Sequence, residues 1–276
     1  MTGVIEQPSR ARVKALIRNE WRRALRDVNA LVPVVLFPVL FNVLLPGLAV
    51  GLVANSGDAV KQLHGMEAFL ERVGAAVAPG SGTQEIIITA ITMYVFAPMF
   101  LLIPMVVATA SASAAFVGER ERRTLDGLLY GPASIREIFL AKTLASTIPA
   151  VVVTWIVFVV FTAIVNVAGW PVMGSVFFPD LTWVVAVAAL IPLLAFVIVG
   201  SIVAISNRAR SVQSAQGVVV FFFLPLVASI ISQATGAILL NHTFVAFTGV
   251  ALALLAGLVY RILGRVVDDP DLVLKT

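Results

Sequence analysis

The chain has 276 residues, of which 60% are hydrophobic and only 12% charged, and its mean hydropathy is +1.02. A water-soluble domain carries about 25% charged residues, so this composition excludes one and indicates an integral membrane protein. The sequence contains no cysteine, which excludes disulfides and cysteine-ligated metals.

A basic, amphipathic segment at residues 9–28 precedes the first long apolar stretch. Its apolar residues share one helical face at 3.6-residue spacing, and its arginines occupy the opposite face. This pattern is typical of an interfacial helix, whose apolar face lies among acyl chains and whose basic face meets anionic headgroups. We therefore expect an elbow helix over 9–28. Its apolar face comprises Val13, Leu16, Ile17, Trp21, Ala24, Leu25 and Val28.

Six apolar stretches follow, each long enough to cross a hydrocarbon core of about 30 Å as a helix. They cover about residues 31–54, 86–117, 135–167, 182–206, 215–240 and 243–264. No stretch resembles a linker, and no internal repeat is present. We predict an all-α, polytopic membrane protein in which residues 1–276 form a single transmembrane domain with six transmembrane helices.

The basic residues are distributed unequally between the predicted loops. Segments 1–30, 117–142 and 206–214 and the tail from Tyr260 hold 7, 5, 2 and 3 of them, which is 17 of the 19, whereas loop 55–85 holds the other two. The positive-inside rule therefore predicts that both termini lie in the cytoplasm. The basic pI reflects this topology, and we expect no nucleic-acid partner.

Ionisable side chains are absent from the middle of the predicted spans, which argues against a proton-coupled transporter. No G-x-x-x-x-G-K-[ST] loop, H-E-x-x-H or G-x-S-x-G motif occurs in the sequence. We therefore expect no catalytic residue, no metal site and no ATP site in this chain. Weakly polar side chains do occur in the spans, and they form either helix-to-helix hydrogen bonds or a path for an amphipathic substrate. The candidates for such a path are Asn42, Ser229, Ser232 and Gln233.

The predicted cytoplasmic loop between the second and third spans carries the most informative pattern. Leu125, Leu128 and Leu129 fall on one face of a short helix, predicted over 119–130, which Gly131 and Pro132 end. A push on this helix would move both attached spans together, although an ordinary surface hairpin gives the same pattern.

This loop resembles that of the permease subunits of ABC-2 type transporters, which typically reads G-E-R-E-x-G-T-L-E-x-L-L-x-x-P-x-S followed by a lysine. Arg123 and Asp126 depart from the family's glycine and glutamate, and segments 15–20 and 25–27 also resemble the family's elbow helix. The matching loop residues are Gly118, Glu119, Arg120, Glu121, Thr124, Leu125, Leu128, Leu129, Pro132, Ser134 and Lys142.

The resemblance implies that this chain is the permease of an ATP-driven exporter in the inner (plasma) membrane. It implies a second permease chain, as homodimer or heterodimer, and a separate ATP-binding cassette ATPase that binds ATP and Mg²⁺. The alternatives are an ATP-independent secondary transporter or channel-like protein, and a membrane scaffold. The residues that the resemblance assigns to coupling with the ATPase are Glu119, Arg120, Glu121, Thr124, Leu125, Leu128 and Leu129.

Overall fold

The described part of the chain is built from helices alone. A computed structural model describes residues 10–24, 28–56, 67–77, 80–96, 99–118, 135–206, 217–234 and 241–268. The α-helices are α1 (Arg10–Ala24), α2 (Val28–Val39), α3 (Leu45–Asn55), α4 (Glu67–Ala76), α5 (Thr83–Thr89), α6 (Met99–Ala112), α9 (Ile135–Met173), α10 (Leu181–Val185), α11 (Ile191–Ser206), α13 (Val218–Ala234) and α14 (His242–Asp268). Between them lie π-helical segments η1 (Leu40–Leu44), η3 (Ala90–Val95), η4 (Ser113–Gly118) and η5 (Ala186–Leu190).

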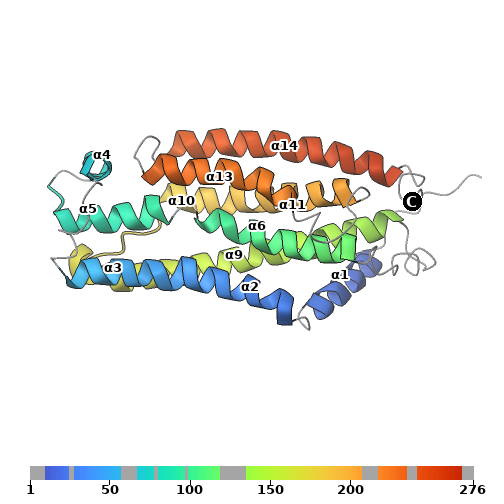
Figure 1. Ribbon diagram of the computed structural model, residues 1–276, viewed down its shortest axis with the longest axis horizontal. Helices are drawn as coiled ribbons and strands as arrows, with labels where there is room; N and C mark the ends of the chain where they lie inside the picture. The colour runs from blue at the N-terminus through green and yellow to red at the C-terminus, as the bar shows by residue number, and fades with distance from the viewer. Residues whose placement is uncertain are drawn as a thin grey trace, which may run out of the picture.

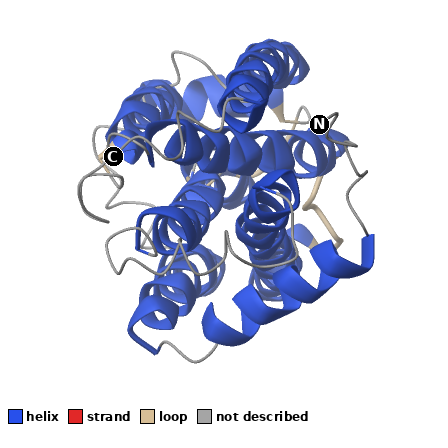
Figure 2. Cartoon of the chain, turned by 90° about the vertical axis from the view of Figure 1, so that its right-hand side faces the viewer, coloured by secondary structure: helices blue, strands red, loops and turns tan. Residues whose placement is uncertain are grey.

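The long helices lie side by side along one axis, with α1 slanting across one end of the bundle and α4 at the other (Figure 1). We call these the α1 end and the α4 end. Figure 2 looks along the bundle from the α1 end and shows α1 crossing obliquely beside helices that are seen nearly end-on. At the α4 end, Thr182 Oγ1 lies 3.0 Å from Nδ1 of His242, so the starts of α10 and α14 are in contact.

Five helices among the described residues are long and apolar enough to cross a membrane. They cover Val34–Asn55, Thr83–Phe116, Glu137–Met173, Leu181–Ala204 and His242–Gly264. The predicted count of six spans is therefore not confirmed. The remaining predicted span, 215–240, corresponds to α13, whose 17 described residues extend about 25 Å, less than a hydrocarbon core of about 30 Å.

The third span is longer than predicted, because α9 continues for 39 residues to Met173 instead of ending near 167. The prolines inside it, Pro149 and Pro171, do not end the helix. In the predicted elbow segment, α1 accounts for residues 10–24, and its position relative to a membrane surface stays a prediction.

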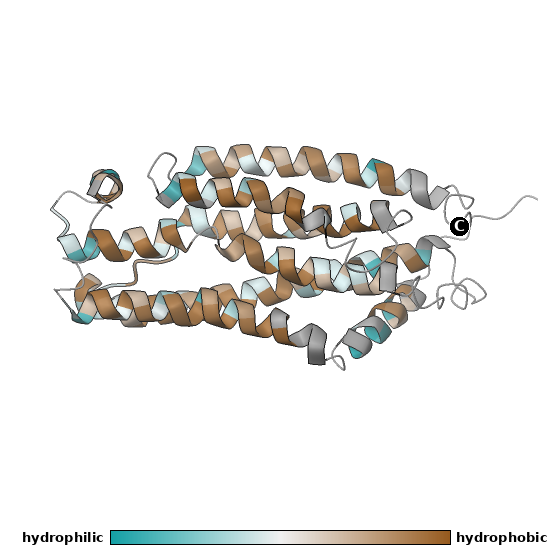
Figure 3. Cartoon of the chain, in the orientation of Figure 1, coloured by the Kyte–Doolittle hydropathy of each residue, from teal (hydrophilic) through white to brown (hydrophobic). Residues whose placement is uncertain are grey.

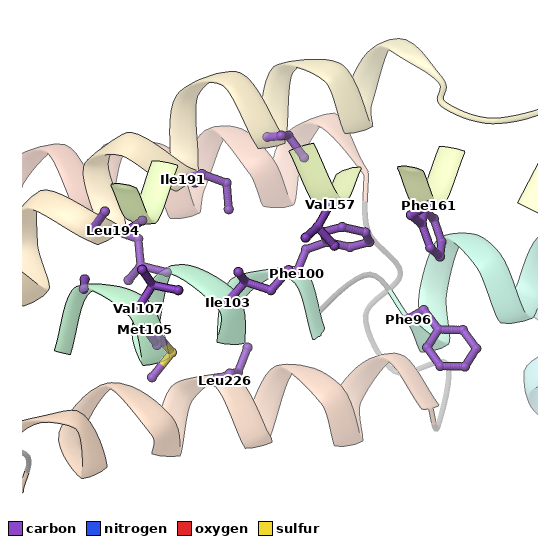
Figure 4. Packing of buried hydrophobic residues seen from close by; sticks show 14 of the residues in the cluster. Phe96, Phe100, Ile103, Met105, Val107, Val157, Phe161, Ile191, Leu194 and Leu226 are labelled. Atoms are coloured by element: carbon purple, nitrogen blue, oxygen red, sulfur yellow. The ribbon is translucent and has the colours of Figure 1, made fainter. Parts of the chain in front are cut away.

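The core of the bundle is centred on α6. Phe100, Ile103 and Met105 of this helix are at most 1% exposed, and they pack between α9, α11 and α13 (Figure 4). Residues from the other three helices close the cluster, among them Phe161, Ile191 and Leu226.

Large apolar side chains also cover the outside of the bundle. Leu48, Leu52, Val159, Val167 and Leu254 are each more than 60% exposed. Figure 3 shows hydrophobic residues along the middle of the long helices, with hydrophilic ones gathered at the ends and on α1. Such a large apolar surface is unfavourable in water and suits hydrocarbon, as expected for a multi-pass membrane protein.

The π-helical segments interrupt three of the predicted spans, with η1 in the first, η3 and η4 in the second, and η5 in the fourth. A π-helical turn inserts one residue per turn and is frequent at functional sites. Asn42, Thr92 and Ser113 lie in η1, η3 and η4, and each is fully buried. Among the described residues, η1, η3 and η4 therefore each contain a buried polar side chain, whereas η5 is apolar throughout.

Candidate functional site

The predicted coupling loop is attached to η4 at one end and to α9 at the other, both at the α1 end of the bundle. Helix 119–130 lies outside the described residues, and so do all seven residues assigned to coupling. The geometry of this site therefore comes from its two attachment points, residues 113–118 and 135–146.

Lys142 joins these two attachment points. Its Nζ donates a hydrogen bond of 2.7 Å to the backbone carbonyl oxygen of Ala115 and lies 5.8 Å from the centre of the Phe116 ring. The Phe116 ring also packs on Phe139, one turn before Lys142 on α9. Only 3% of Lys142 is exposed, so this ammonium is held inside the bundle.

Helix α1 packs on the same part of α9. Trp21 Nε1 donates a hydrogen bond of 3.1 Å to the carbonyl oxygen of Ala145, and Val13 is 8% exposed. The basic residues Lys14, Arg18 and Arg22 are exposed. The apolar face predicted for the elbow helix thus lies partly against α9, while its basic face points away from the bundle.

Asn42 is the most deeply buried of the predicted substrate-path residues. It is 0% exposed, and within the described part of the chain neither its Nδ2 nor its Oδ1 has a hydrogen-bond partner. An unsatisfied buried polar group costs about 1–3 kcal/mol. Asn42 lies on η1, which packs on α9 and α6.

The other predicted path residues lie on α13. Gln233 is 2% exposed, and its Nε2 donates to Ser229 Oγ at 3.2 Å, while its Oε1 has no partner among the described residues. Ser232, on the same turn, is half-buried. The structure therefore brings Ser229 and Gln233 together, whereas Asn42 lies on a different helix; α6 contacts both elements.

Further buried hydroxyl groups also lack hydrogen-bond partners among the described residues, although they were not predicted as substrate-path residues. Thr92, Thr109 and Ser113 are each at most 6% exposed, and their Oγ atoms lack partners within the described residues. In contrast, Thr154 and Ser201 donate to the carbonyl four residues earlier in their own helices. The sequence does not separate these two groups, because it does not show which hydroxyls turn back to a carbonyl of their own helix.

The candidate path residues carry neutral amides and hydroxyls, which can bind an uncharged or zwitterionic molecule by hydrogen bonds. In the part of the chain that the structure describes, no three His, Cys, Asp or Glu side chains come close enough to hold a metal ion.

Comparison with known proteins gives one match. The model of the ABC-2 family transporter proteins matches residues 14–260. No curated protein and no solved structure matches the chain. The matched region begins within α1, includes the loop between η4 and α9, and ends within α14.

Proposed function

Because the chain belongs to the ABC-2 transporter family, we propose that it is the membrane-spanning permease subunit of an ATP-driven exporter. The observation that carries the proposal is the family match over residues 14–260. The 276-residue sequence contains no phosphate-binding loop of the G-x-x-x-x-G-K-[ST] type, which supports a separate ATPase subunit as the site of ATP and Mg²⁺.

The loop between η4 and α9 is the proposed contact with this ATPase. Its attachment to two long helices supports a lever, because both helices move if the loop moves as a rigid body. The apolar face of Leu125, Leu128 and Leu129 would be exposed to water in a free loop, and a groove on the ATPase would cover it. The charged side chains of Glu119 to Arg123 would then orient the contact from its rim.

A small amphipathic or lipid-like molecule is the proposed substrate. Support comes from the neutral polar groups inside the bundle, at Asn42 and at Ser229, Ser232 and Gln233, and from their apolar surroundings. Export out of the cytoplasm requires the α1 end to be cytoplasmic, as the distribution of 17 of 19 basic residues predicts. A second permease chain would complete the path.

The ATP-independent alternative, a secondary transporter or channel, makes a different prediction for the loop. The test substitutes Leu128→Asp, which places a carboxylate in the proposed apolar contact. The tagged chain is expressed in its native host, and co-purifying cassette ATPase is identified by mass spectrometry and assayed for Mg-ATP hydrolysis. We expect bound ATPase to fall about tenfold or more, since an unpaired buried charge costs several kcal/mol.

Tyr130→Asp is the matched control, because Tyr130 lies about 160° from Leu128 on the predicted helix at 100° per residue. This variant should retain the ATPase. The chain's yield and melting temperature should be unchanged in both variants, since the loop is predicted to lie outside the membrane spans. Normal ATPase binding and hydrolysis in Leu128→Asp would contradict the coupling role and favour the ATP-independent alternative.

A further inference from the structure

A buried side chain joins the two attachment points of the loop. The loop follows η4 and precedes α9 in the chain, so these helices are separated by 16 residues of sequence, 119–134. Lys142 spans this separation inside the bundle, with its Nζ 2.7 Å from the carbonyl oxygen of Ala115. The lysine and its acceptor are 27 residues apart in sequence.

The contact links one helix to the backbone of another. Ala115 lies three residues before Gly118, the last described residue of η4, and its carbonyl oxygen accepts a hydrogen bond from a side chain of α9. Lys142 therefore connects the second predicted span to the third through a backbone carbonyl.

Burial strengthens this contact. Lys142 is only 3% exposed, and its Nζ lies 5.8 Å from the centre of the Phe116 ring. Phe116 is itself only 4% exposed. An ammonium shielded from water interacts more strongly with a carbonyl dipole and with an aromatic face than an exposed one. Separation of η4 from α9 would leave a buried cation without this acceptor.

A third element rests on the same stretch of α9. Ala145, less than one helical turn from Lys142, accepts the hydrogen bond from Trp21 of α1 at 3.1 Å. Residues 142–145 of α9 thus contact both η4 and α1. We call this three-way contact the α9 node; it consists of Lys142, Ala145, Ala115, Phe116 and Trp21.

We propose that Lys142 is a positioning residue that fixes η4 against the first turns of α9, so that the loop displaces η4, α9 and α1 as one rigid body. The proposal rests on the proposed function, because an ATPase is what would displace the loop. Without the Lys142 contact, the packing of Phe116 on Phe139 alone holds the two ends less tightly, and the displacement is absorbed at the α1 end instead of reaching the α4 end.

A purely structural role for Lys142 has a different consequence. If the lysine only stabilises the fold, its replacement lowers the melting temperature, and the chains that do fold transmit movement normally. The positioning role instead changes the distance between η4 and α9 in chains that are folded. Distances in the folded chain therefore distinguish the two roles.

The chain has no cysteine, so spin labels can be placed on introduced cysteines without background. One pair, Ala114→Cys and Leu140→Cys, uses exposed positions of η4 and α9 and reports the α9 node. A second pair, Ser56→Cys and Leu181→Cys, uses exposed positions at the α4 end. Electron paramagnetic resonance is measured in phosphatidylethanolamine–phosphatidylglycerol nanodiscs, with labelled chain diluted by unlabelled chain, alone and with the associated ATPase under ATP and vanadate.

In the native background, we expect the node pair to give one narrow distance that ATP and vanadate do not change, and the α4-end pair to shift. In Lys142→Met, the distribution of distances between the labels of the node pair should broaden. The shift of the α4-end pair should be lost while the ATPase stays bound. The fixed arrangement should lose about tenfold or more in population, the scale of a hydrogen bond donated by a charged group. Lys142→Arg, which keeps a cationic donor, should restore both signals.

Lys14→Met is the matched control, since it makes the same chemical change at an exposed lysine of α1, and it should behave as the native chain. If Lys142→Met does not fold, Lys142→Gln is used in its place. The glutamine side chain is one bond shorter than lysine and carries a neutral amide, so it should not reach the Ala115 carbonyl, and the node distances should broaden as in Lys142→Met.

Native distances and a native α4-end shift in the folded Lys142→Met or Lys142→Gln chain would overturn the proposal. A Lys142→Arg chain that lost both the narrow node distance and the α4-end shift would also contradict the proposal. The shape of the side chain would then be decisive, and not its hydrogen bond to Ala115. Failure of the native chain to associate with any ATPase would instead overturn the proposed function, and the node pair measured in the chain alone would still test Lys142.

Discussion

Asn166 determines the conformation of the segment that connects α9 to α10. Its Oδ1 accepts hydrogen bonds from the backbone N–H groups of Phe177 and Phe178 at 3.0 and 3.3 Å, and its Nδ2 donates to the Phe178 carbonyl at 2.6 Å. The segment is thereby folded back into the α4 end of the bundle. As a result Phe178 is 0% exposed, although it lies outside any helix.

Phe178 completes a buried aromatic cluster. Its ring lies 5.2 Å from Phe161, 5.7 Å from Phe158 and 5.5 Å from Trp183, between ring centres, and the two phenylalanines of α9 also contact Phe100 of α6. Edge-to-face contacts of this kind contribute about 0.5–1.5 kcal/mol each beyond the area that they bury. A connecting segment therefore supplies part of the core between α6, α9 and α10.

We predict that Asn166→Ala destabilises the protein by at least about 2 kcal/mol. The substitution leaves backbone groups of Phe177 and Phe178 buried without partners, and each such group costs about 1–3 kcal/mol. The measurement is the melting temperature of the chain in detergent. Asn55→Ala is the control, since Asn55 is exposed and bonds only within its own helix, to the Gly51 carbonyl. Equal melting temperatures for the two variants would show that Asn166 does not hold the segment.

At the scale of elements, the contact between α11 and α14 depends on the absence of a side chain. A Cβ atom at Gly200 of α11 would collide with Cγ1 of Val259 on α14, so the two backbones approach closely at this point. Gly47 has a similar role between α3 and α9, where a Cβ would lie 2.6 Å from Ile164 Cγ2. Small residues allow such close approach between helices in a membrane, where packing replaces the hydrophobic effect as the source of association.

We predict that Gly200→Ala destabilises the bundle by about 1–3 kcal/mol, the usual cost of overpacking. The double variant Gly200→Ala/Val259→Ala removes the colliding methyl group and should recover part of the loss. Gly257→Ala on α14 is the matched control, because a Cβ there meets nothing within 4 Å and alanine favours a helix more than glycine does. Thermal unfolding in detergent distinguishes the three variants, and equal stability of Gly200→Ala and Gly257→Ala would refute the close contact.

For the molecule as a whole, charge and apolar surface are unequally distributed along the bundle. The exposed basic residues Lys14, Arg18 and Arg22 of α1 lie at one end of the bundle, and the exposed Ala76 of α4 lies at the other. The belt of exposed apolar side chains lies between the two ends (Figure 3). Which end faces the cytoplasm stays a prediction of the positive-inside rule.

We predict that a cysteine at Ala76 reacts with an impermeant thiol reagent added to intact cells, whereas a cysteine at Asn19 does not. Both positions are exposed, and the chain contributes no other thiol, so a difference in labelling reports the side of the membrane. Both variants should react after the cells are permeabilised. Labelling of Asn19→Cys in intact cells, with protection of Ala76→Cys, would reverse the proposed orientation.

The sequence alone determined the class of protein, the positions of most helices and the family. These properties follow from local composition, because a helix that crosses hydrocarbon must satisfy its own backbone and present about 20 apolar residues. The resemblance carried by the loop at 118–142 was confirmed by the family match. For segment 215–240 the sixth span stays a prediction, because the described helix within it covers 17 residues.

The tertiary structure alone decided which polar residues are paired. Asn166 and Asn42 are both asparagines in apolar helices, yet Asn166 makes bonds to a connecting segment 11 and 12 residues away and Asn42 has no partner among the described residues. Lys142 finds its acceptor 27 residues away, beside a π-helical turn that no sequence pattern indicated. Hydropathy is a property of each segment, whereas a hydrogen bond between helices depends on their rotation and depth, which are set by packing against every neighbour.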